Sequence, residues 1–207
     1  MISTAMLALV RTWLQESTAA FWSDAEVYTA LSTGQRELVR MAVKDYEQLS
    51  IVNPTTDVLH ILVPLQKAGA ITITSSSGSL PSDYLHLISG TFTPTGGSAT
   101  PILRRRQNSA TAASQVNTFL TGTAAHEYYA WVAGTSLTLE TSGLAGTANI
   151  AYISIPVDID ATHNATIPDD FHNAVCQFAY GQLLKKTEDE TQKKSQIEYD
   201  QFQMMRQ

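Results

Sequence analysis

The sequence predicts an α+β fold: an antiparallel α-helical bundle built from both ends of the chain, with a small antiparallel β-sandwich or barrel inserted. Residues 1–64 place apolar side chains at helical spacing. Between 65 and 157, Lys and Glu nearly vanish, and Ser, Thr, Gly and Ala separate short alternating runs. Helical spacing returns in 158–207. We therefore expect an N-terminal helical segment, a β-rich insertion and C-terminal helices that complete the bundle.

Composition limits the classes of protein that the chain can belong to. With 207 residues, 43% hydrophobic and 15% charged, the chain can bury about 70% of its unfolded surface. A formal net charge of −6 argues against wrapped nucleic acid, which needs a basic face. A single cysteine, Cys176, excludes an internal disulfide. Arg11 interrupts the apolar N-terminus too early for a signal peptide or membrane span, so we expect a soluble protein made in a cytoplasm.

The longest predicted helix covers residues 21–50. Ser23 is its expected N-cap, and Glu26 closes a capping box. Asn53-Pro54 ends it, because proline disfavours helix in the preceding residue. Gly34, costly inside a helix, indicates a close approach of another helix. The predicted buried stripe is Val27, Leu31, Leu38, Ala42, Tyr46 and Leu49.

Two shorter helices are expected beside this long one. Residues 3–15 form the first and pair with the long helix in antiparallel orientation, with Arg11, Gln15 and Glu16 on the outer face. Residues 56–63 form a short helix capped by Thr56 or Asp57, and Pro64 stops it.

The insertion is expected to contain short strands separated by glycine-containing turns. Residues 109–120 are the one stretch there that could form a short helix. The predicted strands are 70–74, 84–92, 102–103, 128–132, 136–139 and 149–155. The predicted turns are 76–78, 95–97, 133–135 and 142–146.

The C-terminal block opens with a helix start, because Pro168 is followed by the carboxylates Asp169 and Asp170 at the positive end of a helix dipole. A break near 187–189 precedes a last amphipathic helix with Ile197, Phe202 and Met205. The expected apolar face of the first of these helices is Phe171, Ala174, Val175, Phe178 and Leu183.

The residues that could carry chemistry form no catalytic constellation, so we predict that the chain is not an enzyme and binds no cofactor. Asp158 to Asn164 places oxygen ligands at alternate positions, as a calcium loop does. His163 stands where such a loop needs glycine, and Asp169 replaces the bidentate glutamate. We interpret the segment as a polar linker and predict no metal. Cys176 lies off the predicted apolar face and is expected to be a small packing residue.

Two basic features are candidate contact sites. Arg36, Arg40 and Lys44 share one face of the long helix, where like charges repel. Something acidic should face them, either 188–190 or a neighbouring subunit. The run 104–106, three arginines, is either a solvated strand end or a contact with nucleic acid or a tail protein.

Several motifs in chain order resemble head–tail connector (adaptor) proteins of tailed double-stranded-DNA bacteriophages. The N-terminal motif is Phe21, Trp22, Ser23 and Asp24, followed by Leu31 and Gln35 to Leu38. Ser32 and Gly34 depart from the usual Asn and Ala of that family. The insertion adds Leu80 to Tyr84, an aromatic hairpin at Tyr128 to Gly134, and Tyr152 to Pro156; Pro168 to His172 follows.

This resemblance implies a structural protein of the virion neck, assembled in the host cytoplasm, that binds the portal and extends the DNA conduit to the tail tube or nozzle. It implies a ring of about twelve copies with heterologous contacts. Double-stranded DNA would pass through an acidic or neutral lumen without specific binding. It also implies that the C-terminal segment reaches the portal. There Phe202, Met204, Met205 and Arg206 are the candidate anchors, because methionine adapts to partner surfaces.

A receptor- or glycan-binding β module on a helical stalk is the alternative. Tyr128, Tyr129 and Trp131 could stack on sugars. We expect these aromatic side chains to lie in the core of the insertion instead, which would argue for the adaptor.

Overall fold

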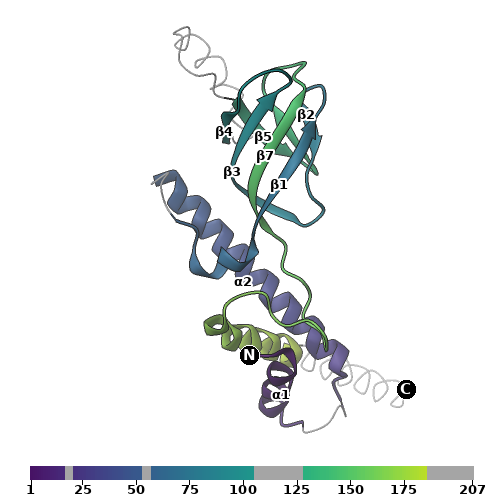
Figure 1. Cartoon of the computed structure of the whole chain (residues 1–207). Helices are drawn as coiled ribbons and strands as arrows, with labels where there is room; N and C mark the ends of the chain where they lie inside the picture. The colour runs from purple at the N-terminus through teal and green to yellow at the C-terminus, as the bar shows by residue number, and fades with distance from the viewer. Residues whose placement is uncertain (17–20, 53–56, 105–127, 186–207) are drawn as a thin grey trace, which may run out of the picture. The chain divides into compact units, whose positions relative to one another are not determined.

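A computed structural model describes residues 1–16, 21–52, 57–104 and 128–185 (Figure 1). The fold is mixed α+β, as predicted, and the chain divides into two compact units. The helical unit comprises the described residues of Met1–Pro64 and of Pro156–Gln207. The β unit is Leu65–Ile155, a continuous stretch of chain.

The helical unit contains α1, Ser3–Trp13, and α2, Asp24–Val52. The 3-10 turn η2, Asp169–Phe171, leads directly into a helix over residues 172–185, which confirms the predicted helix start. α1 ends before the predicted residue 15 because Gln15 has a left-handed backbone, with φ of 57°. The predicted helix 56–63 is instead the 3-10 helix η1, His60–Leu65, in the described part of the chain. Pro64 lies inside η1, since its fixed φ suits a helical turn.

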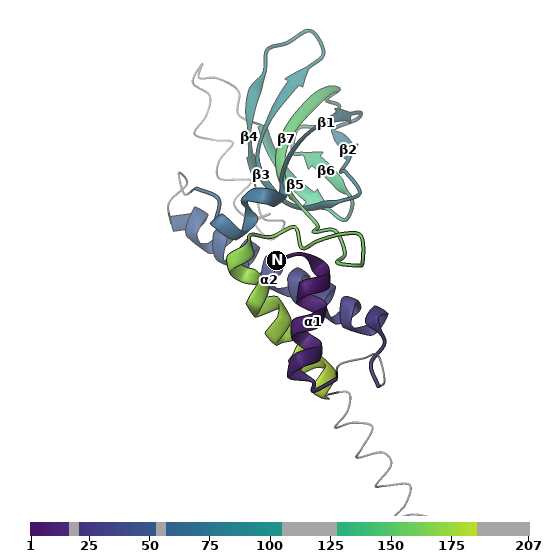
Figure 2. The ribbon, with the colours of Figure 1, turned by 60° about the horizontal axis from the view of Figure 1, so that its bottom comes forward.

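α1 and the helix 172–185 run side by side in the same direction (Figure 2). The Met1 amino group lies 2.8 Å from His172 Nδ1. Cys176 Sγ faces the Met6 carbonyl oxygen at 3.9 Å, and the rings of Trp13 and Tyr180 are 6.0 Å apart. The paired positions rise together along both helices, so the predicted antiparallel arrangement is wrong for this pair. No short loop joins these two helices, and only short loops impose antiparallel neighbours.

The buried face of α2 differs from the predicted stripe. Leu38 is only half-buried and Leu49 is 46% exposed, whereas Val39 and Gln35 are completely buried. Gln35 can occupy a core position because its amide is satisfied on both sides: Nε2 donates to Val157 O at 2.9 Å, and Oε1 accepts from Thr166 N at 2.7 Å. The apolar residues completely or largely buried on α2 are Val27, Tyr28, Ala30, Leu31, Val39, Ala42 and Tyr46.

The β unit is one seven-stranded sheet with the strand order β1-β7-β3-β4-β5-β6-β2. The strands are β1 (Gln66–Ile73), β2 (Ser77–Ser79), β3 (Tyr84–Pro94), β4 (Thr100–Arg104), β5 (Tyr128–Ala133), β6 (Ser136–Leu139) and β7 (Gly146–Ser154). The edge strands β1 and β2 are consecutive in the chain and are bridged at Thr74 and Ser77, so the sheet curls into a nearly closed barrel (Figure 1).

β2 was predicted as a turn because Ser77–Ser79 lacks large apolar side chains. Its Gly78 explains how the barrel closes. A Cβ at Gly78 would lie 2.5 Å from Thr72 O and 2.6 Å from Ile71 Cγ2. Only glycine therefore fits where β2 approaches β1.

One pair of strands departs from the predicted antiparallel sheet. β4 and β5 are parallel, with Ile102 opposite Tyr128. Parallel neighbours need a long crossover, and the chain between these two strands is residues 105–127. The predicted short helix 109–120 falls in that stretch, outside the described residues. A core of alternating inward-facing residues fills the barrel; it is Ile71, Ile73, Leu87, Phe92, Ile102, Ala130, Leu137, Leu139, Ala148, Ile150 and Tyr152.

Candidate functional site

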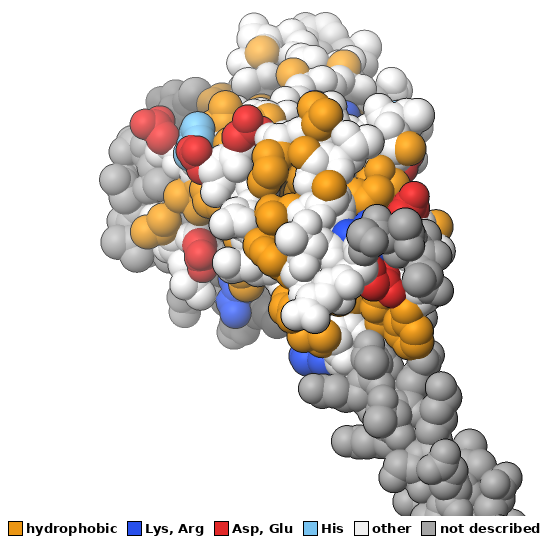
Figure 3. Space-filling model, turned by 90° about the horizontal axis from the view of Figure 1, so that it is seen from below, with side chains coloured by type: hydrophobic (Ala, Val, Ile, Leu, Met, Phe, Trp, Pro, Cys, Tyr) orange, Lys and Arg blue, Asp and Glu red, His pale blue; other side chains and the backbone are white. Residues whose placement is uncertain are grey.

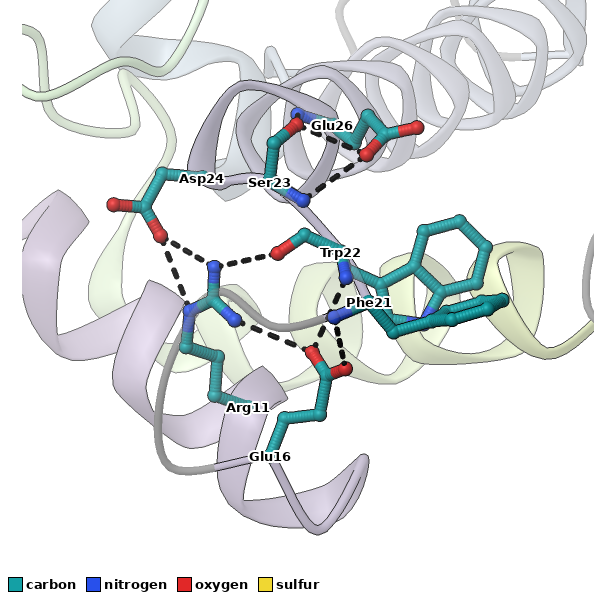
Figure 4. A network of polar contacts seen from close by, with 7 residues as sticks. All are labelled: Arg11, Glu16, Phe21, Trp22, Ser23, Asp24 and Glu26. Atoms are coloured by element: carbon teal, nitrogen blue, oxygen red, sulfur yellow. Dashed lines mark hydrogen bonds and ion pairs between the residues drawn. The ribbon is translucent and has the colours of Figure 1, made fainter.

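A buried arginine organises the corner between α1 and α2 (Figure 4). Arg11, expected on the outer face, is only 7% exposed. Its Nη2 donates to the Trp22 carbonyl oxygen at 2.9 Å and to Asp24 Oδ1 at 2.5 Å, and its Nε donates to the same Asp24 oxygen at 3.1 Å. These acceptors compensate the desolvation of the guanidinium, which is why the side chain can be buried. The sequence prediction treated Arg11 as solvated because its acceptors lie beyond the helix that carries it.

Glu16 extends this network to the chain just before α2 (Figure 4). Its Oε2 lies 3.3 Å from Arg11 Nη1, and its Oε1 accepts from the Phe21 backbone N–H at 2.8 Å. The Phe21 ring packs edge-on against Trp22, with centroids 4.9 Å apart. Trp22 is 4% exposed, whereas Phe21 is 54% exposed. The network therefore presents an aromatic side chain to solvent from a fixed backbone.

The capping box that begins α2 is confirmed. The Ser23 N–H donates to Glu26 Oε2 at 3.0 Å, and the Glu26 N–H donates to Ser23 Oγ at 3.3 Å. Each side chain thus satisfies a backbone donor that the first turn leaves unpaired. The motif from Phe21 to Asp24 consequently sets where α2 starts and how the preceding chain enters it.

The close helix approach predicted at Gly34 is also confirmed. A Cβ there would lie 3.1 Å from both Phe178 Cδ1 and the Val175 carbonyl oxygen.

Cys176, expected off the apolar face, is completely buried, and burial raises the pKa of its thiol to about 11. The apolar face is rotated from the prediction, because Ala174 is exposed and the helix packs on α1 as well as α2.

In the β unit, the motif Leu80 to Tyr84 places Asp83 between the first and last strands. Lys67 Nζ, on β1, lies 2.5 Å from Asp83 Oδ2, and the Tyr152 hydroxyl, on β7, donates to Asp83 Oδ1 at 3.0 Å. The hydrogen bond from Lys67 lowers the pKa of Asp83, and the same bond raises that of Lys67. Burial, together with Asp83, raises the pKa of Tyr152. Asp83 therefore fastens the strands through which the chain enters and leaves the barrel.

The comparison with protein families accounts for these motifs together. The family model described as SU10 adaptor protein matches residues 2–207. The chain belongs to the SU10 adaptor family. The predicted resemblance to phage head–tail adaptors is confirmed, and the family is one of structural virion adaptors, not a class of enzymes. A search among curated protein sequences finds no significant match.

The basic face of α2 in this adaptor is partly neutralised within its own unit. Arg36 Nη2 lies 2.5 Å from Asp158 Oδ1, and Arg40 Nη1 lies 2.6 Å from Glu37 Oε1. Lys44 makes no ion pair with any residue in the ranges that the structure describes. The acidic residues 188–190, expected opposite this face, lie outside those ranges. Among the described residues, Lys44 is therefore the cation of this face that has no ion-pair partner.

The polar linker before the last described helix is folded on itself. Asp160 Oδ2 faces His163 Nδ1 at 2.9 Å, and Asp160 Oδ1 accepts from the Thr162 and His163 backbone N–H groups at 2.6 and 2.7 Å. The bond to the His163 ring and then those from Thr162 lower the pKa of Asp160. No group of three or more His, Cys, Asp or Glu side chains among the described residues is arranged to hold a metal.

The aromatic hairpin of the adaptor is divided between two faces of the barrel. Tyr128 packs edge-on against Phe92 in the core, with ring centroids 4.9 Å apart. Tyr129 and Trp131 alternate with the inward-facing Ala130 and are half-buried on the outer face, so the expectation that all three lie in the core is wrong. Alternation along β5 could have indicated this, since odd and even positions cannot both point inward.

The remaining candidate sites mostly lie outside the described residues. Arg104 ends β4, and 105–106 and the anchor candidates Phe202, Met204, Met205 and Arg206 fall in undescribed stretches. None of the helices in the described ranges combines the length and hydrophobicity that crossing a membrane requires.

Proposed function

We propose that this chain is a subunit of the adaptor ring that joins the portal to the tail of a double-stranded-DNA phage. The observation that carries the proposal is the match to the SU10 adaptor model over residues 2–207. A ring of about twelve copies, joined by heterologous contacts, would continue the DNA conduit from the portal to the tail tube or nozzle. The ring would be assembled in the host cytoplasm and retained in the virion neck.

The acidic character of the chain supports passage of DNA through such a ring. A formal net charge of −6 per subunit disfavours the release of counterions that makes DNA bind tightly. The helical unit would form the side-by-side contacts of the ring, and the β unit would face outward or toward the tail. In this proposal Arg104, Arg105 and Arg106 contact a tail protein or DNA at that end.

The proposed portal anchor is the C-terminal segment with Phe202, Met204, Met205 and Arg206. Apolar residues near a chain end, followed by a cation, suit insertion into a groove between portal subunits. Deleting 203–207 should abolish co-sedimentation with portal rings and leave the melting temperature unchanged. The double variant Gln203→Ala with Gln207→Ala is the matched control and should still bind.

The function as a whole is tested by imaging the neck that contains this chain. Electron cryomicroscopy class averages should show a ring of adaptor density between portal and tail. Phage that lack this gene product should accumulate heads without tails. Necks whose portal joins the tail without this chain would overturn the proposal.

A glycan-binding role is the second candidate, because Tyr129 and Trp131 lie on the outer face of the barrel. Aromatic faces stack on sugars when they are open to solvent. In a glycan array, the full chain should then bind a sugar class and lose that binding on Trp131→Ala. Absence of binding to any glycan would remove this candidate and leave the adaptor proposal untouched.

A further inference from the structure

The two units are joined by two crossings of the chain, and each crossing has a proline at the boundary. The helical unit ends at Pro64 on the way into the barrel and resumes at Pro156 on the way out. At the first crossing η1 ends at Leu65, and β1 begins with the next residue. At the second crossing β7 ends at Ser154, two residues before Pro156. Neither crossing therefore contains a loop in which motion could be spread over many residues.

Within the β unit, the entering and leaving segments of chain are fastened to each other. The pairing of β1 with β7 runs along the whole of β1, and the Ser154 hydroxyl donates to the Leu65 carbonyl oxygen at 3.1 Å. The Ile155 N–H donates to the Asp83 carbonyl oxygen at 2.7 Å. The two segments consequently leave the barrel side by side, as one paired ribbon.

Within the helical unit, the chain is held again close to each crossing. On the way out of the barrel, the Val157 carbonyl oxygen accepts from Gln35 Nε2 at 2.9 Å. On the way in, Leu62 is completely buried. The chain between these anchors is short: it is residues 63–64 at the first crossing, and at the second the backbone between the Ile155 N–H and the Val157 carbonyl group.

The side chains at the crossings contribute little apolar burial that a motion would have to break. Val63, Ile155 and Val157 are 50%, 40% and 53% exposed, respectively. The parts of a protein that move are drawn from regions with few buried apolar contacts. The face drawn in Figure 3 shows several patches of hydrophobic side chains, so exposure alone would not identify a hinge. The position of these three residues between anchors on both sides does.

We propose that the two crossings form a two-point hinge, about which the β unit swings as a rigid body relative to the helical unit. Motion about the line that joins the crossings changes only a few backbone torsions at the ends of elements, as in other protein hinges. Motion in other directions would pull the two segments apart and break the bond between Ser154 and Leu65. Pro64 and Pro156 fix φ at about −65° and so limit how far the hinge opens. This inference does not depend on the proposed ring.

Distances between spin labels on paired cysteines measure this motion directly. Thr147→Cys, at an exposed position of β7, carries one label. The other label is placed in turn at three exposed positions of the helical unit: Thr29→Cys, Gln48→Cys and Gln177→Cys. The completely buried Cys176 stays unlabelled, and dilution with unlabelled chain removes distances between copies. The three distance distributions should be several-fold wider than those of labels within one unit, and rotation about a single axis should reproduce all three.

Two pairs of labels within a unit give the reference width. They are Thr29→Cys with Gln177→Cys in the helical unit, and Thr72→Cys with Ser89→Cys in the β unit, all at exposed positions. Distributions between the units that are as narrow as these would overturn the hinge. Wide distributions that no single rotation reproduces would overturn the two-point geometry and indicate two independent tethers.

Substitutions at the crossings test what limits the motion. Pro156→Gly frees φ and should widen the distributions between the units further, whereas Pro101→Gly, at an exposed position of β4, is the control and should not. Ser154→Ala removes the bond to Leu65, so a single rotation should no longer suffice. Equal widths in Pro156→Gly and its control, or a single rotation preserved in Ser154→Ala, would overturn the corresponding part of the hinge. Pro64→Gly repeats the first test, and thermal melts verify that every variant is folded.

Discussion

The two units bury different kinds of side chain to position distant parts of the chain. In the helical unit, polar residues of α2 hold the returning segment: Ser32 Oγ accepts from Ile159 N at 2.9 Å, and Gln35 binds both Val157 and Thr166. In the β unit, the main core is a continuous apolar cluster around Phe92. Apolar burial thus shapes the barrel through many interchangeable contacts, whereas the helical unit combines an apolar core with buried polar residues of α2 that make specific hydrogen bonds. Substitutions in the two units should therefore differ in size and in how well a similar residue restores stability.

The largest effect should come from the barrel core. Phe92 is completely buried, and Phe92→Ala should lower the free energy of unfolding by about 3–5 kcal/mol. Phe92→Leu should recover much of that loss, because the barrel needs volume more than a specific contact. Urea unfolding followed by circular dichroism measures both, with the exposed Thr147→Ala as control. Equal midpoints for Phe92→Ala and the control would show that this cluster does not stabilise the barrel.

The next largest loss of stability should come from substitutions of Gln35, and no apolar residue at this position should restore the free energy of unfolding. Gln35→Ala leaves the Val157 carbonyl and the Thr166 N–H without their partner, at about 2–3 kcal/mol. Gln35→Leu should be nearly as harmful, since volume is restored without the hydrogen bonds. The same urea unfolding measures these losses against Leu38→Ala, one turn away and half-buried, which should lose less. A larger loss for Leu38→Ala than for Gln35→Ala would show that the predicted stripe containing Leu38, and not Gln35, forms the core of the helical unit.

Two glycines of the helical unit test how closely its helices pack, because Gly34 lies against another helix and Gly181 lies in open space. Gly34→Ala should destabilise by about 1–2 kcal/mol, since its Cβ would press on the Val175 backbone oxygen. Gly181→Ala meets no atom within 4 Å and should stabilise by up to about 1 kcal/mol through helix propensity. Thermal melts of the two variants should therefore shift in opposite directions. Shifts of the same sign would contradict the close packing at Gly34.

The smallest effect concerns the partly exposed pair of Lys67 and Asp83. Asp83→Asn should remove less than about 1 kcal/mol at neutral pH. The folded state lowers the pKa of Asp83, so the stabilisation is complete above about pH 4 and disappears as the pH falls through the folded value. Melting temperatures between pH 2 and 7 should consequently depend less on pH in Asp83→Asn than in the original chain. Asp57→Asn, an exposed carboxylate, is the control and should keep the original dependence.

Local sequence signals predicted most elements, since propensity, caps and alternation act over a few residues. The capping box at Ser23, the glycine at position 34 and the strands with large apolar side chains were recognisable in this way. β2 was not, because a strand of Ser and Gly is defined by its closeness to β1. The parallel pairing of β4 and β5 was also missed, because strand direction depends on the path of the chain between them.

The candidate site was less predictable for a related physical reason. Arg11 and Gln35 are polar residues that become core residues only when acceptors or donors arrive from distant segments. Periodicity assigns such residues to the surface by default. The motif Phe21 to Asp24 indicated the position of the corner. The burial of Arg11 beneath it depends on acceptors at Trp22 and Asp24, which lie outside the helix that carries Arg11. Met41 and Leu49 illustrate the opposite case, in which apolar residues with helical spacing stay exposed within one chain.

The division of the chain has a consequence for the order in which a ribosome can complete the two units. The β unit is continuous from Leu65 to Ile155, whereas α1 meets its partner helix only across sequence separations such as Met6 to Cys176. During synthesis the barrel can close while α1 and α2 still wait for residues 156–185. We expect the helical unit to gain its final supports only after that segment emerges. Newly made subunits would then be unable to join one another until each chain is nearly finished.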